Sequence, residues 1–413
     1  MSRPPTDEPI RTRCCVAGGG PAGMMLGFLL ARAGVDVVVL EKHADFLRDF
    51  RGDTIHPSTL EVMHELGLLE EFLRRPHQEM SRLDGQVGDT RLTIADFSHL
   101  PTRCKFLAFM PQWDFLNFLA EQGKRYPTFH LRTEAAVTDL MTEGGRVTGV
   151  EAKTPGGVLR VEADLVVGAD GRSSTVRELA GLESLDLGAP MDALWMQISK
   201  APGDPGQTFG RIAAGQILVL IDRGDYWQCA YVIPKGKFEE IRRRGLPGLR
   251  ETIATLAPFL RDRVGELIDW SEVKLLTVKV DRLRQWYRPG LLCIGDAAHA
   301  MSPIGGVGIN LAIQDAVAAA NILALPLWHG AVSPDHLRAV QRRRELPTRV
   351  TQAVQVFIQN RVIRNVLASS QPQIALPLAL RLLRRWHWLQ RIPAYLVGIG
   401  VRPEHVRAPA LRA

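Results

Sequence analysis

The chain contains little cysteine and no long apolar run. Its 413 residues include five cysteines, with no CxxC pair and no grouping of cysteine with histidine at the spacing of metal ligands. We therefore expect reduced thiols, a cytoplasmic protein and no metal site. No uninterrupted apolar run approaches the ~20 residues that cross a bilayer, and residues 1–9 have no apolar core of the kind found in secretory signals. We expect no transmembrane segment and no export by that route.

A recognition module for nucleic acid is also lacking, although the formal net charge is +7. Positive charge without such a module favours a solvated face that attracts anionic NADPH or an acidic substrate, so we expect no nucleic-acid partner. Part of the excess lies in Arg-rich stretches near the C-terminus. There, residues 376–401 mix Leu, Trp and Arg, which predicts an amphipathic packing helix or, as the alternative, a contact with a membrane surface.

What is present is an ordinary globular composition, 46% apolar and 23% charged, with length for about two or three domains. Three segments read as strand, glycine-containing turn and helix: residues 13–41, 164–179 and 291–320. In the second, Thr175 and Glu178 have the spacing of a capping box. Further helices are predicted to begin at Ser58, whose hydroxyl can cap the first turn, and near Gln112.

The stretch between the second and third segments has a different texture. Residues 185–281 contain short alternating runs broken by Gly-Asp and Pro-Gly pairs, which predicts an antiparallel sheet that covers a ligand. We therefore predict an α/β fold with a discontinuous Rossmann-like domain and a second domain with a mixed or antiparallel sheet, followed by C-terminal helices. The predicted boundaries are 1–75, 103–180 and 285–332 for the first domain, 76–102 and 181–284 for the second, and 333–413 for the helices.

A glycine turn in the first segment predicts dinucleotide binding. Gly18, Gly20, Pro21, Ala22 and Gly23 lie in a GxGxxG turn between an apolar strand and a helix, where backbone N–H groups can approach a pyrophosphate. Glu41 ends the next strand, and a carboxylate there can accept hydrogen bonds from a ribose diol. The turn alone leaves open whether the nucleotide is FAD or NAD.

Two further motifs carry a family resemblance. The run Gly168-Ala-Asp170-Gly171-Arg172-Ser-Ser-Thr-Val-Arg177 resembles the DG motif of class A flavoprotein monooxygenases, which p-hydroxybenzoate hydroxylase typifies. The run Gly295-Asp296-Ala-Ala-His299-Ala-Met-Ser-Pro303, with the glycines that follow, resembles their GD motif. The resemblance covers residues 13 to about 325 in the family's order. It implies that the discontinuous Rossmann-like domain is an FAD-binding domain that holds FAD non-covalently, and that the sheet domain holds the substrate beside the flavin. It also implies that NAD(P)H docks without a second nucleotide-binding fold.

The resemblance also assigns cofactor contacts residue by residue. Asp296 would hold a ribityl hydroxyl, and the loop after it would bring backbone N–H groups and a helix N-terminus to the flavin. Asp170 would bridge the FAD groove and the NAD(P)H path, or act mainly by bonding nearby backbone. The other residues predicted to contact the cofactor are Lys42, Arg51, Gln112, Pro303, Gly305, Gly306, Val307, Gly308, Ile309 and Asn310. Their structural alternatives are turn formation, helix capping and ordinary surface positions.

The implied activity is oxygen transfer to a small organic substrate, most often aromatic or phenolic, by way of a flavin C4a-hydroperoxide. NADPH or NADH would be the reductant and dioxygen the co-substrate. No acid or base can be assigned, although His56 and Tyr226 are possible choices, and His299 is predicted to be a core histidine bonded to backbone rather than a proton carrier. Residues of the predicted sheet that can face a substrate are Trp195, Phe209, Gln216, Gln228 and Tyr231.

Three other functions share this fold. A flavin-dependent halogenase carries a Trp-x-Trp-x-Ile-Pro signature, of which only the ending, Ile233-Pro234, is present here. A non-catalytic escort protein would not need intact DG and GD loops. A flavin oxidase or dehydrogenase would leave no oxygen atom in its product, and the sequence does not name the substrate that would separate these cases.

Overall fold

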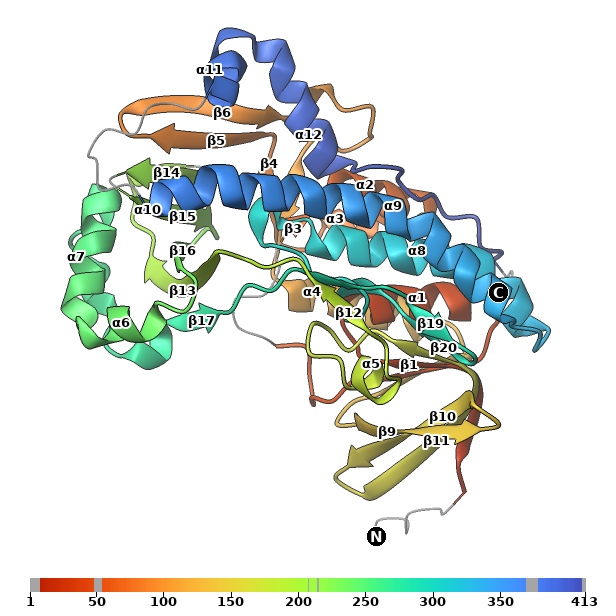
Figure 1. The fold of residues 1–413 in the computed structure, drawn as a ribbon. Coiled ribbons are helices and arrows are strands. Elements are labelled where there is room, and N and C mark those ends of the chain that lie inside the picture. The colour runs from red at the N-terminus through yellow and green to blue at the C-terminus, as the bar shows by residue number, and fades with distance from the viewer. Residues whose placement is uncertain (1–7, 48–53, 207, 214, 369–377, 411–413) are drawn as a thin grey trace.

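The structure is a computed structural model. It describes residues 8–410 except 48–53, 207, 214 and 369–377. Two large sheets lie at opposite ends of the molecule, with a long pair of helices running between them (Figure 1). Each sheet has its own buried apolar cluster, so each provides a separate hydrophobic core.

The first sheet has eight strands in the described part of the chain. Its main path is β19-β20-β11-β1-β2-β8, and β10 and β9 extend β11 as an antiparallel wing. Strands β20, β11, β1, β2 and β8 are all parallel. Strands β20 and β2 and the carboxyl-terminal ends of β1 and β11 are buried and apolar, as expected for strands covered on both faces. The bounds are β1 (Ile10–Ala17), β2 (Val37–Leu40), β8 (Phe129–Arg132), β9 (Ala136–Glu143), β10 (Arg146–Thr154), β11 (Gly157–Gly168), β19 (Tyr287–Arg288) and β20 (Leu291–Cys293).

Helices cover this sheet. The Ala- and Leu-rich α1 (Pro21–Arg32) packs against α4 (Gln112–Gly123) and α8 (Gly308–Trp328). The continuous helical stretch Ile304–Trp328 is long and apolar enough to cross a membrane, but 72% of its apolar window is buried inside the fold, so it serves here as a core helix. The remaining helices around this sheet are α2 (Pro57–Glu65), α3 (Leu69–Leu73) and α5 (Thr175–Leu179).

The second sheet has seven strands among the described residues, in the order β17-β13-β16-β15-β14-β5-β6. All neighbours are antiparallel except β14 and β5, so the sheet is mixed. The bounds are β5 (Arg82–Val87), β6 (Thr90–Asp96), β13 (Met191–Ser199), β14 (Phe209–Ala213), β15 (Gln216–Asp222), β16 (Tyr226–Pro234) and β17 (Lys274–Leu276). Short strands complete the fold: β3 (Thr54–Ile55), β4 (Gln78–Met80) and β7 (Leu107–Phe109) form one sheet, and β12 (Ser184–Asp186) pairs with β18 (Asp281–Leu283).

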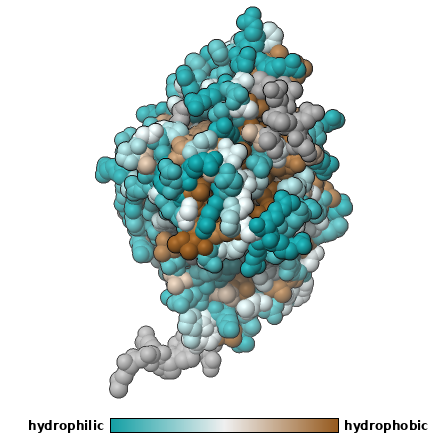
Figure 2. All heavy atoms as spheres, turned by 90° about the vertical axis from the view of Figure 1, so that its left-hand side faces the viewer, coloured by the Kyte–Doolittle hydropathy of each residue, from teal (hydrophilic) through white to brown (hydrophobic). Residues whose placement is uncertain are grey.

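The two faces of the second sheet have different neighbours. The outer face packs its apolar side chains against α6 (Phe238–Arg243) and α7 (Leu246–Leu256) in one cluster that includes Leu194, Leu218 and Trp227. Figure 2 shows this side of the molecule as mainly hydrophilic, with hydrophobic side chains gathered near its middle. The inner face carries the alternate residues, and its Met191 and Val232 pack with Ile304 of the glycine-rich loop.

The C-terminal helices bind the two halves together. The long α9 (Pro334–Ile358) lies along α8 and continues through a π-helical turn (Gln359–Ile363) into α10 (Arg364–Ala368), which contacts β15 and β16. Two shorter helices, α11 (Leu378–Arg385) and α12 (Arg391–Gly398), then pack against β6 (Figure 1). The stretch predicted as one amphipathic helix therefore forms two. The predicted domain boundaries stay a prediction.

Two of the expected helix caps are wrong. The N-cap of α2 is His56, and the Ser58 hydroxyl instead donates to Asn310 Oδ1 at 2.8 Å. The N-cap of α5 is Ser174, whose hydroxyl accepts from the Arg177 N–H, so Thr175 is the first helical residue. At α2 a distant acceptor takes the Ser58 hydroxyl, whereas at α5 the cap lies one residue earlier than predicted, an offset that is common at helix ends.

Candidate functional site

The three motifs converge at one edge of the first sheet. Ala17 of β1 lies beside Gly168 of β11 and Leu40 of β2, and Gly168 lies beside Cys293 of β20. Because these strands are parallel, their carboxyl ends meet at the same edge. The residues that follow them are Gly18, Ala169-Asp170, Glu41 and Ile294-Gly295-Asp296. Ligands of open α/β sheets bind at this edge.

The glycine turn is shaped by close backbone approaches. Gly18 has φ +109°, and a Cβ there would lie 2.4 Å from the carbonyl oxygen of Ala169. A Cβ at Gly23 would lie 1.9 Å from the Gly18 carbonyl oxygen, whereas one at Gly20 would meet nothing within 4 Å. Gly18 and Gly23 are therefore needed for close packing, and Gly20 borders open space. No side chain caps the N-terminus of α1 and no acidic residue occupies its first turn, so its N–H groups suit a phosphate anion.

Glu41 is held against this turn. Its carboxylate accepts from the Gly19 N–H at 2.9 Å and from the His43 N–H at 3.1 Å, and the residue is 8% exposed. The neighbouring Lys42 is exposed. The carboxylate thus lies beside the predicted pyrophosphate turn, where a ribose diol would follow.

Asp170 joins the DG motif to the same edge. Its carboxylate accepts from the Ser174 hydroxyl at 2.5 Å and from the Val176 N–H at 3.1 Å, at the start of α5. Burial raises the pKa of this carboxyl. The Asp170 backbone also lies against Gly18, so the residue both organises its own motif and borders the glycine turn.

Asp296 lies where the GD motif meets α8. Its Oδ2 is 3.3 Å from the Arg172 guanidinium of the DG motif, and its side chain is 29% exposed. A Cβ at Gly308, the first residue of α8, would lie 4.0 Å from Asp296 Oδ1. The carboxylate is therefore accessible next to a helix N-terminus that no side chain caps. The ion pair with Arg172 was not predicted, although both residues stand in recognised motifs.

The loop from Pro303 to Val307 needs its glycines. Gly305 and Gly306 have φ +77° and +63°, and a Cβ at Gly306 would lie 3.0 Å from Thr54 Oγ1. Asn310 is buried and its Oδ1 accepts from the hydroxyls of Ser58 and Thr59 at 2.8 and 2.9 Å. Its carbonyl oxygen thus fixes α8 to α2. Pro303, Val307 and Ile309 complete the turn that leads into α8.

His56 also contacts this loop. It is fully buried and its Nε2 lies 3.2 Å from the Gly305 carbonyl oxygen, to which Nε2–H donates. Burial lowers the pKa of His56 to about 4, so the imidazole is neutral at neutral pH. The side chain therefore holds the loop through Gly305. Because the imidazole is neutral, it is not available as a cationic acid. Tyr226, the other possible acid or base, begins β16 with its side chain on the inner face.

Two further residues, Gln112 and Arg51, stay predictions as cofactor contacts. Gln112 is the first residue of α4 and is half-buried. Arg51 lies outside the described residues.

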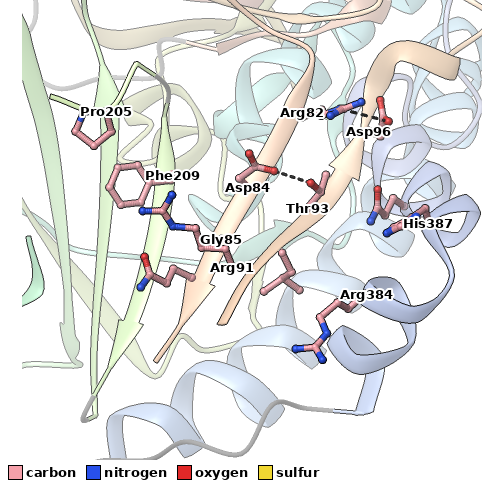
Figure 3. Close-up of a pocket in the computed structure, with 13 residues that line it drawn as sticks. Arg82, Asp84, Gly85, Arg91, Thr93, Asp96, Pro205, Phe209, Arg384 and His387 are labelled. Atoms are coloured by element: carbon pink, nitrogen blue, oxygen red, sulfur yellow. Dashed lines mark hydrogen bonds and ion pairs between the residues drawn. The ribbon is translucent and has the colours of Figure 1, made fainter. Parts of the chain in front are cut away.

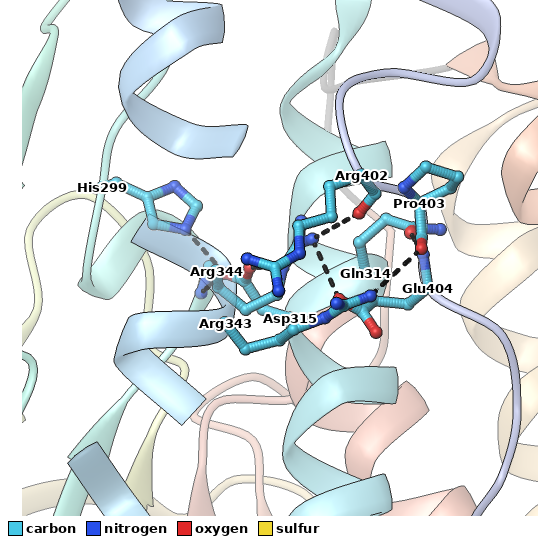
Figure 4. A network of polar contacts seen from close by, with 9 residues as sticks. His299, Gln314, Asp315, Arg343, Arg344, Arg402, Pro403 and Glu404 are labelled. Carbon is cyan, nitrogen blue, oxygen red and sulfur yellow. Dashed lines mark hydrogen bonds and ion pairs between the residues drawn. The ribbon is translucent and has the colours of Figure 1, made fainter. Parts of the chain in front are cut away.

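A buried ionic network holds Gly295 and His299 of the GD motif (Figure 4). Asp315 of α8 accepts from His299 Nε2 at 2.6 Å, from Arg344 Nε at 2.9 Å and from the Gly295 N–H at 3.0 Å. Arg344 also lies 3.4 Å from Glu404. His299 is therefore a core histidine, but the prediction of a backbone partner is wrong because a carboxylate holds it. Sequence reasoning missed Asp315 and Arg344, since neither belongs to a motif.

Three buried glutamines, two on α9 and one on the π-helical turn that continues it, hold the loop that begins at Ala300. Gln355 donates to the carbonyl oxygens of Ser302 and Ile304 at 3.0 and 2.9 Å and accepts from the Ser302 N–H at 3.1 Å. Gln352 bonds the Ala300 carbonyl oxygen, and Gln359 donates to the Ser302 hydroxyl. The spacing of these glutamines on one helical face is the signal that could have found them.

Strand register separates the residues expected to face a substrate. Trp195 and Gln228 lie on the inner face, in register with Ala230 and Gln197. The other three lie on the outer face. Phe209 and Tyr231 pack with the apolar cluster that includes α6 and α7, and Gln216 pairs with Ala213 of the same cluster. Only the first two are therefore turned toward the first sheet.

A sheet edge with a glycine turn, two uncapped helix N-termini and a strand-end carboxylate defines a dinucleotide-binding site, and these features fit FAD. The FAD-binding-domain family model matches residues 11–354, and the chain belongs to that family. It is a class A flavoprotein monooxygenase, which confirms the resemblance.

The match to this chain covers most of one curated relative and about two thirds of another. The 6-methylpretetramide 4-monooxygenase of Streptomyces rimosus is 36% identical over 91% of this chain and 90% of its own. The dialkyldecalin synthase of Streptomyces rugosporus is 30% identical over 73% of this chain, which spans 63% of that protein. The p-nitrophenol 4-monooxygenase PnpA of Pseudomonas putida has the same fold, with a TM-score of 0.75 and 20% identity over 95% of this chain and all of PnpA.

Proposed function

We propose that this edge of the first sheet binds FAD and that the protein hydroxylates an aromatic substrate of the kind represented by 6-methylpretetramide. The observation that carries the proposal is the convergence of Gly18, Asp170 and Asp296 beside two uncapped helix N-termini. When bound, FAD supplies the redox chemistry, taking hydride from NAD(P)H and using dioxygen to oxygenate the substrate. The similarity to a monooxygenase over almost the whole chain supports the substrate class.

Each part of the edge would hold a different part of FAD. The turn from Gly18 to Gly23 and the start of α1 would donate N–H groups to the pyrophosphate. Glu41 would accept from the adenosine ribose, with Lys42 outside it, and Asp296 would accept from a ribityl hydroxyl. The start of α8 would place N–H groups and a partial positive charge beside the flavin carbonyl edge. The remaining predicted contacts are Arg51, Gln112, Asp170 and the loop from Pro303 to Asn310.

The substrate would lie on the inner face of the second sheet. One end of this face is closed by Met191 and Val232, which pack with Ile304, and the other by Ile221, which packs near Phe109. Between them the register places Trp195, Ala230 and Val219 side by side. This central strip, which we call the substrate strip, is apolar and suits an aromatic ring system.

The protein's own groups would position the substrate and keep water out. Ile304 and the π-helical turn of residues 359–363 border the inner face, and their apolar side chains exclude solvent from it. His56 stays neutral and holds Gly305 in place, so we assign it a positioning role. No side chain is assigned as the acid or base.

We further infer that the protein works in the cytoplasm. All five cysteines are free and buried, as expected where thiols stay reduced. Burial raises the pKa of Cys15 to about 12 and that of Cys104 to about 11, which makes both thiols unreactive.

A substrate screen tests the proposal. Flavin-loaded protein is given NADH or NADPH with a series of aromatic compounds from single-ring phenols to 6-methylpretetramide, and nucleotide oxidation is followed. We expect the larger apolar compounds to accelerate it and Trp195→Ala to weaken that response. If none of them changes the rate while the flavin is bound and reducible, the substrate class is wrong.

A further inference from the structure

One cavity of the described residues lies on the second sheet, away from the edge where the three motifs converge. It has a volume of about 570 Å³, within the size range of small-molecule sites. Figure 3 shows Pro205 and Phe209 on one side of it and Arg384 and His387 on the other, with the β5–β6 hairpin between them. The remaining walls come from β5, β6 and the 3₁₀ turn after α11.

Strand register places this cavity on the outer face. Phe209 of β14 pairs with Asp84 of β5, so both side chains point to the same side, and Phe209 packs with the α6 and α7 cluster. Leu83 and Ile221 point the other way and pack with Phe109. A ligand in the cavity would therefore lie across the sheet from the substrate strip.

The cavity has more positive charge than its own acids neutralise. Arg82 lies 3.6 Å from Asp96, and Asp84 accepts from the Thr93 hydroxyl at 2.8 Å. Arg91 and Arg384 are exposed, and neither forms an ion pair with another residue that the structure describes. Two guanidinium groups from separate elements thus border one cavity, and such groups recognise carboxylates in a planar, two-bonded geometry.

The same cavity offers apolar surface beside these charges. Phe209 and Pro205 line it, and Gln86, Thr93 and Gln390 add uncharged polar groups. We propose that this cavity is a second ligand site, separate from the catalytic one, for an aromatic compound that carries a carboxylate. The ring would pack on Phe209 and Pro205 while Arg91 and Arg384 bind the carboxylate.

Calorimetric titration with a matched pair of ligands tests the proposal on the flavin-loaded protein. Naphthoate is anionic, and naphthamide has the same ring system without the charge. We expect naphthoate to bind and naphthamide to bind at least about tenfold more weakly. Arg91→Gln and Arg384→Gln should each weaken naphthoate binding about tenfold, because each removes a charge-assisted hydrogen bond.

Arg385→Gln is the matched control, because Arg385 is an exposed neighbour on α11 that does not line the cavity. It should bind naphthoate as the parent does. The flavin absorption spectrum is followed in the same titration, since a ring on the substrate strip would perturb it and a ring on the outer face would not. Equal binding by the parent and both cavity variants, equal binding of naphthamide, equal weakening by Arg385→Gln, or no binding at all would overturn the proposal.

Discussion

Asp315 on α8 and Arg344 on α9 form a fully buried ion pair, with 2.9 Å between Oδ1 and Nε. Burial alone would raise the pKa of Asp315, but His299 and Arg344 outweigh it, so the net pKa is lowered and the carboxylate stays charged. The pair links two long helices directly behind the Gly295 N–H. It is therefore a support of the FAD-binding edge as well as of the core.

Removing this charge should destabilise the protein. Asp315→Asn leaves the buried Arg344 with Glu404, at 3.4 Å, as its remaining anionic partner. Breaking a buried pair costs about 3–5 kcal/mol, and Glu404 places the expected loss toward the lower end of that range. The free energy of unfolding, measured in urea on flavin-loaded protein, checks the value. Asp335→Asn is the control, because its carboxylate is 81% exposed in a surface pair with Arg338 and should cost about 1 kcal/mol or less. Equal losses in the two variants would contradict the account.

His56 should make stability depend on pH. Its pKa falls from 6.5 to about 4 on folding, so between these values the unfolded chain binds a proton that the folded protein excludes. Stability should therefore decrease as the pH falls through this window, by up to about 3 kcal/mol from this group. In His56→Gln that component of the pH profile should be missing. A profile unchanged by the substitution would mean that His56 is protonated in the folded state.

Gln355 should affect both the stability of the protein and its coupling, by which we mean the share of NAD(P)H oxidation that yields hydroxylated product. Gln355→Leu keeps much of the volume but strands backbone groups of Ser302 and Ile304, at about 1–3 kcal/mol for each group left without a partner. Because these groups belong to the loop that we propose lies beside the flavin, we expect a smaller share of the oxidised NAD(P)H to appear as hydroxylated product. Gln341→Leu is the control: Gln341 also bonds backbone, at Arg284 and Trp286, but away from the loop. It should lose stability without losing coupling.

FAD affinity tests the carboxylates of the edge. Glu41→Ala removes a charge-assisted partner of the ribose and should weaken FAD by about 10- to 150-fold. Glu41→Gln keeps an acceptor for the Gly19 N–H and should lose less. Asp296→Ala should likewise give folded protein with much weaker FAD. Dissociation constants from flavin fluorescence decide this, and unchanged values would remove both residues from the site.

The fold class and the converging edge were predictable because they depend on local patterns. An apolar run followed by a glycine turn predicts strand, turn and helix wherever it occurs, and parallel strands bring such turns to one edge. The motifs place Gly18, Asp170 and Asp296 after predicted strands, and the structure brings the ends of those strands to one edge. Their contacts with FAD stay a prediction. The family match then confirms the FAD-dependent monooxygenase.

The supporting contacts were not predictable, because they join residues far apart in the chain. Asp315 and Arg344 each look like ordinary helix residues, and only the packing of α8 on α9 makes them partners. The sequence also could not predict which face of the second sheet each residue occupies, because alternation defines two faces without saying which one is covered. Only the position of α6 and α7 shows that Phe209 and Tyr231 point outward. The predicted cap of α2 was wrong because the Ser58 hydroxyl donates to Asn310, which is distant in the sequence.

The central claim is that the protein transfers oxygen to its substrate. The direct test is turnover of flavin-loaded protein with NAD(P)H and an accepted aromatic substrate under isotopically labelled dioxygen, followed by mass measurement of the product. The account predicts one labelled oxygen atom in the product for most of the NAD(P)H consumed. Label found only in hydrogen peroxide or water, with an oxidised or rearranged product that contains no new oxygen, would contradict it.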